Sequence, residues 1–276
     1  MEIDQLVYSA SMLQDYMDCQ RRFELKYIRK QSWPSIPVEP VLEMEALVAR
    51  GRQFHSLAHQ FLAGLPLPAI NDAINDPMLK KGFSRFVDFS YERSWILKLS
   101  EIKINANLER HHLIAVYDLI AQTDDGQVTI FDWKTAMHPP RKDFLKLKMQ
   151  SSIYPFILFE NLQGLFPSAD QHQHCALSMT YWYPAYPDFI FSFNYDQETH
   201  QENRDSLISF LDAVDSRLQS MQFNKTDNLK QCKYCQYRSL CDRGIEAGTI
   251  DGLDGDSIAD EIMIDFNALP EIDADI

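Results

Sequence analysis

The sequence lacks a hydrophobic run long enough to cross a membrane, because its candidate stretch, IYPFILF, is short and ends at a glutamate. It also lacks the basic and then apolar order of a secretory signal, since the chain starts with the acidic MEIDQL. These two absences predict a cytoplasmic protein, in which thiols stay reduced. The five cysteines are therefore expected to be metal ligands or buried apolar groups, and not disulfides.

Basic residues are missing from the last part of the chain. Residues 246–276 contain ten acids and no Lys or Arg, which predicts a disordered acidic tail behind a folded domain at 1–245. The tail supplies most of the formal charge of −14, because the rest of the chain has 30 acids against 26 basic residues. Such a body can hold a local basic groove, so net charge neither excludes nor supports a nucleic-acid ligand.

The hydrophobic residues, 45% of 276, suffice for one large core or two smaller ones. Their spacing is helical near the N-terminus and then changes to the alternation of β-strands. The order of elements predicts an α/β domain with a central mixed β-sheet flanked by helices. The expected helices span 9–30, 41–68 with a bend near Gly51, 76–91, 141–162 and 197–221, and the expected strands span 94–108, 111–123, 127–135, 175–184 and 188–195.

Three of the cysteines form a tight cluster, Cys232-x2-Cys235-x5-Cys241. A C-x2-C turn presents two thiolates to one metal, and a closed soft site wants four. Cys19, in a polar part of the first helix, is a better fourth ligand than Cys175, which reads as a small buried hydrophobe. Zinc and an iron–sulfur cluster both suit such a set, and unrelated free cysteines are the simpler alternative that the clustering disfavours.

Two acids follow neighbouring predicted strands. Asp118 ends LIAVYD and Asp132 ends VTIFD, and pairing of the strands through the turn at DDGQ would bring both carboxylates to one edge, as Mg²⁺ requires. Residues i and i+2 of a strand point the same way, so Asp132 and Lys134 are expected to share a site while Trp133 enters the core. Taken alone, a solvated surface pair explains Asp132 and Lys134 better.

Other polar residues are candidate ligands only if they lie near the sheet edge that carries Asp118 and Asp132. His55 and His59 share one helical face, and each is more often a core or surface residue than a ligand. Glu101 could support the site but is better explained as a surface acid. Gln150 and Tyr154, at i and i+4, could hold nucleic acid by hydrogen bonds and stacking, although a helical Tyr is more often core.

Together these residues resemble the PD-(D/E)XK nuclease superfamily, in its RecB-like branch with an iron–sulfur cluster, which includes the CRISPR-adaptation exonuclease and the C-terminal nuclease domain of AddB. The resemblance runs from about Ser9 to Arg243, and its strength lies in the order of motifs that are each weak alone. Ala115 departs from the family's usual Gly, His59 stands where many members carry an acid, and the acidic tail is outside the pattern. The motifs are the opening helix with Cys19, GRQFH with His55, AVYD with Asp118, DWK with Asp132 and Lys134, QSSIY with Gln150 and Tyr154, and CKYCQYRSLC with Cys232, Cys235 and Cys241.

The resemblance implies a restriction-endonuclease-like core and a metal-dependent DNA nuclease, expected to be an exonuclease of single-stranded ends in repair, recombination or CRISPR adaptation. It favours a [4Fe–4S] cluster over zinc on the cysteine quartet. A helicase or a recombination or CRISPR protein is an expected partner, because the sequence has no phosphate loop of its own. The alternatives are a catalytically inactive DNA-binding or scaffold protein with the same fold and a zinc-stabilised interaction module. The implied roles are Mg²⁺ or Mn²⁺ ligation by His55, Asp118, Asp132 and the Trp133 carbonyl, water positioning by Lys134, and substrate contacts by Gln150 and Tyr154.

Overall fold

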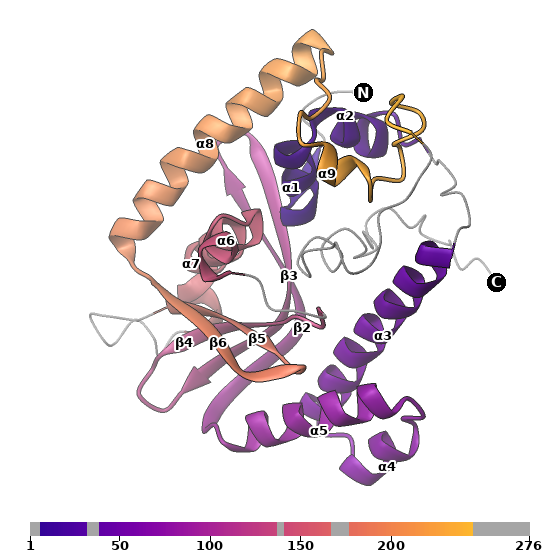
Figure 1. Cartoon of the computed structure of the whole chain (residues 1–276). Coiled ribbons are helices and arrows are strands. Elements are labelled where there is room, and N and C mark those ends of the chain that lie inside the picture. The colour runs from indigo at the N-terminus through magenta and orange to yellow at the C-terminus, as the bar shows by residue number, and fades with distance from the viewer. Residues whose placement is uncertain (1–5, 32–38, 137–140, 167–176, 245–276) are drawn as a thin grey trace, which may run out of the picture.

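The computed structural model describes residues 6–31, 39–136, 141–166 and 177–244, with the backbone alone for 39–45. One six-stranded sheet forms its centre, and helices pack around it (Figure 1). The predicted tail at 246–276 and Cys175 lie outside the described residues. The strands are β1 (Val7–Ser9), β2 (Trp95–Leu108), β3 (His111–Thr123), β4 (Val128–Trp133), β5 (Leu177–Tyr183) and β6 (Tyr186–Tyr195). The helices are α1 (Ala10–Asp18), α2 (Gln20–Phe23), the π-helix η2 (Glu24–Ile28), α3 (Glu39–Leu62), α4 (Leu67–Asp72), α5 (Pro77–Tyr91), α6 (Lys142–Lys146), α7 (Met149–Leu165), α8 (Gln197–Ser220) and α9 (Leu229–Cys232).

Strand β3 is the centre of the sheet. It pairs antiparallel with β2 and with β4, and parallel with the short β1. A tight turn joins β3 to β4, with Gly126 at a φ of 86° and Thr123 N–H donating to Gln127 O at 3.0 Å. Strand β5 runs parallel to β4, which requires a crossover, and α7 provides it. The sheet is therefore mixed, as predicted.

Helices cover both faces of the sheet, each over its own hydrophobic core. The first core joins the sheet to α1, α7 and α8, with Leu13, Ile153 and Leu211 fully buried. The second joins it to α3, α4 and α5, with Phe83 and Trp133 buried among other aromatic rings. The predicted fold class, a central mixed β-sheet flanked by helices, is confirmed. None of the described helices has the length and apolar character needed to cross a membrane.

In the two longest strands, β2 and β3, the set of alternate residues that faces the first core changes partway along the strand. In β3, Leu113, Ala115 and Tyr117 belong to the first core, whereas Leu119 and Ala121 belong to the second. In β2, Glu101 has a φ of 52°, a left-handed conformation that interrupts the regular alternation of side chains. The side of β3 that faces the first core therefore changes at the level of residue 118.

Three helix predictions are wrong in their extent. The helix expected over 141–162 is two helices, α6 and α7, with Lys148 as the N-cap residue of α7. The helix expected to bend near Gly51 runs through that residue without a break and ends at Leu62. Strand β1 and helix α4 were not predicted at all, because three- and six-residue segments carry too little periodicity.

The helix predicted over 9–30 is also interrupted. Ser9 caps it as expected, by accepting a hydrogen bond from Met12 N–H at 3.2 Å. At Cys19, however, the backbone is extended, with φ −162° and ψ 106°. The next N–H groups turn outward, since Arg21 N–H donates to the Asn224 carbonyl at 3.0 Å. A contact with the C-terminal part of the chain therefore divides this helix.

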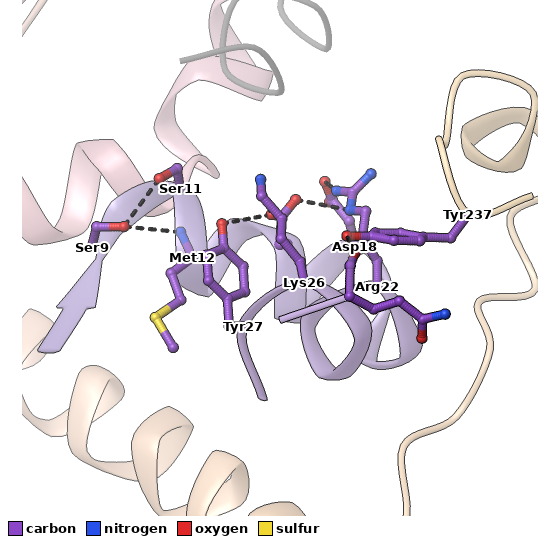
Figure 2. A network of polar contacts seen from close by, with 10 residues as sticks. Ser9, Ser11, Met12, Asp18, Arg22, Lys26, Tyr27 and Tyr237 are labelled. Atoms are coloured by element: carbon purple, nitrogen blue, oxygen red, sulfur yellow. Dashed lines mark hydrogen bonds and ion pairs between the residues drawn. The ribbon is translucent and has the colours of Figure 1, made fainter. Parts of the chain in front are cut away.

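The segments near the two ends of the described chain are joined by polar contacts. Tyr237, which is buried, donates from its hydroxyl to the Gln31 carbonyl at 3.0 Å. Within the N-terminal helices, Arg22 bridges the carboxylates of Asp15 and Asp18 at 2.8 and 2.9 Å. Figure 2 shows the network around Asp18 and Arg22 together with Tyr237. The bond from Tyr237 to Gln31 holds the N-terminal helices beside the cysteine-bearing segment, and the Arg22 pairs hold those helices to one another.

Candidate active site

Asp118 and Asp132 meet where β3 and β4 separate. The regular pairing of these strands ends at Leu119 and Phe131, so continuing the register by one residue places Asp118 opposite Asp132. The next backbone donor, Trp133 N–H, bonds to Asp118 Oδ2 at 2.7 Å instead of to β3 backbone. Both carboxylates are buried. The pairing predicted from the turn at DDGQ therefore brings the two acids together. At the end of the β3–β4 ladder, the Asp118 carboxylate accepts the hydrogen bond of Trp133 N–H.

Asp132 and Lys134 point into one site, as the strand spacing predicted. Lys134 Nζ lies 3.1 Å from Asp132 Oδ2 and donates to Gln150 Oε1 at 2.8 Å. The Gln150 amide in turn donates to Asp132 Oδ1. Trp133 points the other way, into the second core, where it packs on Phe86 and Phe89. A buried lysine thus sits in a fixed position between an acid and an amide.

His55 reaches the site from the helices over the second core, on the other face of the sheet from α7. It lies on α3, and its Nδ1 is 3.0 Å from Asp118 Oδ1. One turn earlier, Gly51 packs against the segment after β4, where a Cβ atom would lie 2.8 Å from Thr135 Oγ1. No larger residue fits there without a shift. The Gly-x3-His spacing therefore lets α3 come close enough for His55 to contact Asp118. His59, one turn later, lies 2.9 Å from Ser100 Oγ through its Nδ1.

Glu101 is exposed, as expected of a surface acid, and it is also part of this group. Its β2 neighbours Ser100 and Ile102 pair with Leu119 and Tyr117, so Glu101 stands at the level of Asp118. Among the described residues, one group of three potential ligands has ligand atoms all within 4.8 Å of one another, namely His55, Glu101 and Asp118. The left-handed φ of Glu101 is the feature that the sequence did not reveal.

The charges in this group perturb one another. Burial lowers the pKa of His55, but the adjacent Asp118 carboxylate, with help from Asp132 and Glu101, outweighs burial and raises it to about 9. Loss of water and repulsion from Asp118 raise the pKa of Glu101 to about 7. Carboxylates that repel one another around an imidazole are relieved by a cation. One nitrogen and several carboxylate oxygens fit a divalent metal ion with open positions.

The predicted metal and substrate residues take different places around this group. Asp132 lies outside the three-residue group and contacts Lys134 and Gln150 instead. Tyr154 is buried on α7, and burial together with the charges of Asp132 and Asp118 raises its pKa well above the usual value. Its backbone carbonyl accepts a hydrogen bond from Tyr117 at 2.8 Å. The metal role of Asp132 and the substrate roles of Gln150 and Tyr154 remain predictions.

The four predicted cluster cysteines lie in two segments that are held together. None of these four cysteines is in a disulfide, and each is partly buried. Burial raises the pKa of both Cys232 and Cys241, and the nearby Cys19 thiol adds to the rise in each. In the described chain the four sulfurs do not converge as tightly as the ligand atoms of the His55 group. Cys19 is nevertheless a neighbour of Cys232 and Cys241, although it is far from them in the sequence.

Comparison with known proteins gives one family match and a number of similar solved structures, among them the following two. The family model described as the PD-(D/E)XK nuclease superfamily matches residues 7–242. The crystal structure of SSO0001 is 14% identical, with a TM-score of 0.40 and coverage of 86% of each chain. That of a "Putative exonuclease" from Eubacterium rectale is 10% identical, with a TM-score of 0.48 and coverage of 85% of this chain and 87% of the other. The curated proteins contain no match to the sequence.

Proposed function

The chain belongs to the PD-(D/E)XK nuclease superfamily, and we propose that it is a divalent-metal-dependent deoxyribonuclease that degrades single-stranded DNA from an end. The observation that carries the proposal is the buried Asp132–Lys134 pair, 3.1 Å apart, next to the His55, Glu101 and Asp118 group. A scaffold protein gains nothing from burying a lysine beside an acid, because burial of charge is costly. A phosphodiesterase uses that arrangement directly.

Each residue of the site has a chemical task in this proposal. His55, Glu101, Asp118 and Asp132, with the Trp133 carbonyl, would hold Mg²⁺ or Mn²⁺. When bound, the metal would polarise the phosphodiester and lower the pKa of water. Lys134 orients the attacking water and offsets negative charge in the transition state. Gln150 keeps the ammonium group of Lys134 in place, since it contacts both Lys134 and Asp132.

The test is degradation of end-labelled single-stranded DNA with Mg²⁺ or Mn²⁺. Asp132→Ala and Lys134→Ala should each abolish cleavage, while Asp124→Ala, an exposed acid in the β3–β4 turn, should cut like the wild type. A circular single strand should resist if the enzyme needs an end. Cleavage by wild type no faster than by Asp132→Ala would refute the enzyme. Binding of DNA by such an inactive wild type would instead support the alternative, a DNA-binding scaffold.

We also propose that Cys19, Cys232, Cys235 and Cys241 hold a [4Fe–4S] cluster that strengthens the junction between the N-terminal helices and the C-terminal segment. The support is the position of Cys19 at the break between α1 and α2, where Arg21 N–H meets the Asn224 carbonyl. Anaerobic purification should give a brown protein with about four irons per chain. A colourless protein loaded with zinc would contradict the cluster. A helicase or a recombination or CRISPR protein would present the strand.

A further inference from the structure

A basic, exposed segment lies directly between the site lysine and the first turn of α7. Residues 141–148 read RKDFLKLK, with four basic residues and one acid, in a chain whose formal charge is −14. Apart from Leu145 and Lys148, every residue of this segment is exposed. The segment is therefore a local positive surface on an acidic protein, and a local field of this kind decides which ligands approach.

Two large apolar side chains stand on this surface without burial. Phe144 is 54% exposed and Leu147 is 69% exposed, whereas Leu145 between them is 1% exposed. The guanidinium of Arg141 lies 5.8 Å from the centre of the Phe144 ring. A basic side chain beside an exposed aromatic face is the arrangement on which nucleic-acid bases stack.

The segment is firmly attached to the body of the protein. The Leu145 side chain enters the first core, and the Leu145 carbonyl accepts a hydrogen bond from Ser151 Oγ at 2.5 Å. At the start of α7, Met149 N–H donates to Gln14 Oε1 at 3.0 Å. A rigid support matters, because an aromatic ring that is already fixed loses little conformational freedom when a base stacks on it.

The segment also has a fixed relation to the site. Only Leu147 and Lys148 separate α6 from α7, and the two helices lie together beside the sheet (Figure 1). Gln150, in the first turn of α7, contacts Lys134 and Asp132. Phe144 is therefore on the helix that directly precedes the one that contacts the site. A phosphodiester at the site would continue as a charged backbone, which is the partner that fits a basic surface here.

We propose that residues 141–148 form a platform that binds single-stranded DNA, with Arg141, Lys142 and Lys146 on the phosphates and Phe144 stacked on a base. This inference rests on the proposed function, since it takes DNA as the substrate of the Asp132–Lys134 site. The platform sets which part of the strand is held next to that site. It also explains how an acidic protein retains a polyanion.

Binding is measured first, so that cleavage does not enter the result. The full chain, with EDTA, is titrated into a fluorescein-labelled oligothymidylate at several salt concentrations. The charge reversal Lys142→Glu with Lys146→Glu should weaken binding at least tenfold and lower the salt slope by roughly 1.4, because each lost phosphate contact removes about 0.7 on a single strand. The matched control is Lys80→Glu with Lys81→Glu, two exposed lysines on α5, and it should bind within twofold of the wild type.

Stacking is tested separately. Phe144→Ala should weaken binding roughly tenfold and should remove the quenching of 2-aminopurine placed along the strand. Tyr91→Ala, which removes an aromatic side chain 72% exposed on α5, should change neither. Both substitutions are at exposed positions, and circular dichroism checks that each variant is folded.

The results separate this inference from the proposed function. If Asp132→Ala abolishes cleavage but the platform variants bind and cut like the wild type, the platform is refuted and the nuclease stands. If the wild type cuts nothing but binds DNA through the platform, the platform stands and the nuclease falls. A wild type that does not bind the oligonucleotide refutes the platform. Loss of binding to anionic phospholipid vesicles in Phe144→Ala, with DNA binding intact, would assign the segment to a membrane surface and also refute it.

Discussion

Gly51→Ala tests how the two sides of the site are held together. The new methyl group would lie 2.8 Å from Thr135 Oγ1, a separation that real Cβ atoms essentially never show, so α3 or the segment after β4 has to move. His55 is one helical turn further along α3, and its Nδ1 is 3.0 Å from Asp118. Any movement of α3 away from β4 therefore separates His55 from the carboxylates.

The expected effect on stability is small. Ala is favoured over Gly inside a helix by roughly 1 kcal/mol, whereas overpacking costs about 1–3 kcal/mol. The net loss in the free energy of unfolding is then about 0–2 kcal/mol, set against ~5–15 kcal/mol for a typical domain. The variant stays folded. A displacement of about 1 Å at a catalytic group, by contrast, lowers the rate by roughly 100-fold.

The assay compares urea unfolding with metal-dependent cleavage for four proteins. They are the wild type, Gly51→Ala, Thr135→Ala and the double variant. Thr135→Ala removes the clashing oxygen, and the next atom, Thr135 Cβ, would lie at an ordinary contact distance of 3.9 Å. The double variant should therefore regain most of the activity. Full activity of Gly51→Ala, or no recovery in the double variant, would show that this close approach does not position His55.

Three further predictions concern other parts of the chain. Ser9→Ala removes the hydrogen bond to Met12 N–H and should cost about 1 kcal/mol in urea unfolding; an unchanged midpoint would contradict the cap. Burial lowers the pKa of His200, so the unfolded chain takes up the proton first and stability falls as pH drops below about 6.5; His200→Gln should flatten that fall in urea midpoints. Glu101→Gln should weaken Mn²⁺ binding in calorimetry about tenfold, and equal affinity would exclude Glu101 as a ligand.

Much of the sheet and half of the site follow from local sequence. The turn between β3 and β4 fixes which residues pair, and alternation then places Asp132 and Lys134 on one side and Trp133 on the other. These features depend on neighbours within about fifteen residues, and so they can be predicted. The family motifs supplied His55 and Gln150, whose contacts with the strands no local pattern shows.

The features that the sequence did not reveal depend on distant contacts. The break at Cys19 lacks a Gly or Pro signal, because it comes from a hydrogen bond between Arg21 and Asn224, about two hundred residues later. Glu101 joins the His55 group only because β2 pairs with β3 in one register and because its own backbone is left-handed. A glutamate is not a residue type that predicts such a backbone.

The site draws its residues from both helical layers, and this explains why the facing side of β3 has to change at the site. Gln150 approaches Asp132 and Lys134 from α7, which lies over the first core, while His55 approaches Asp118 from α3, which lies over the second. In a sheet with unbroken alternation, two directly opposed residues such as Asp118 and Asp132 point to the same face, so helices on opposite faces cannot both reach them. The change of facing side in β3 and the parting of β3 from β4 open the sheet there. The bond from Trp133 N–H to Asp118 then joins the two halves across that opening.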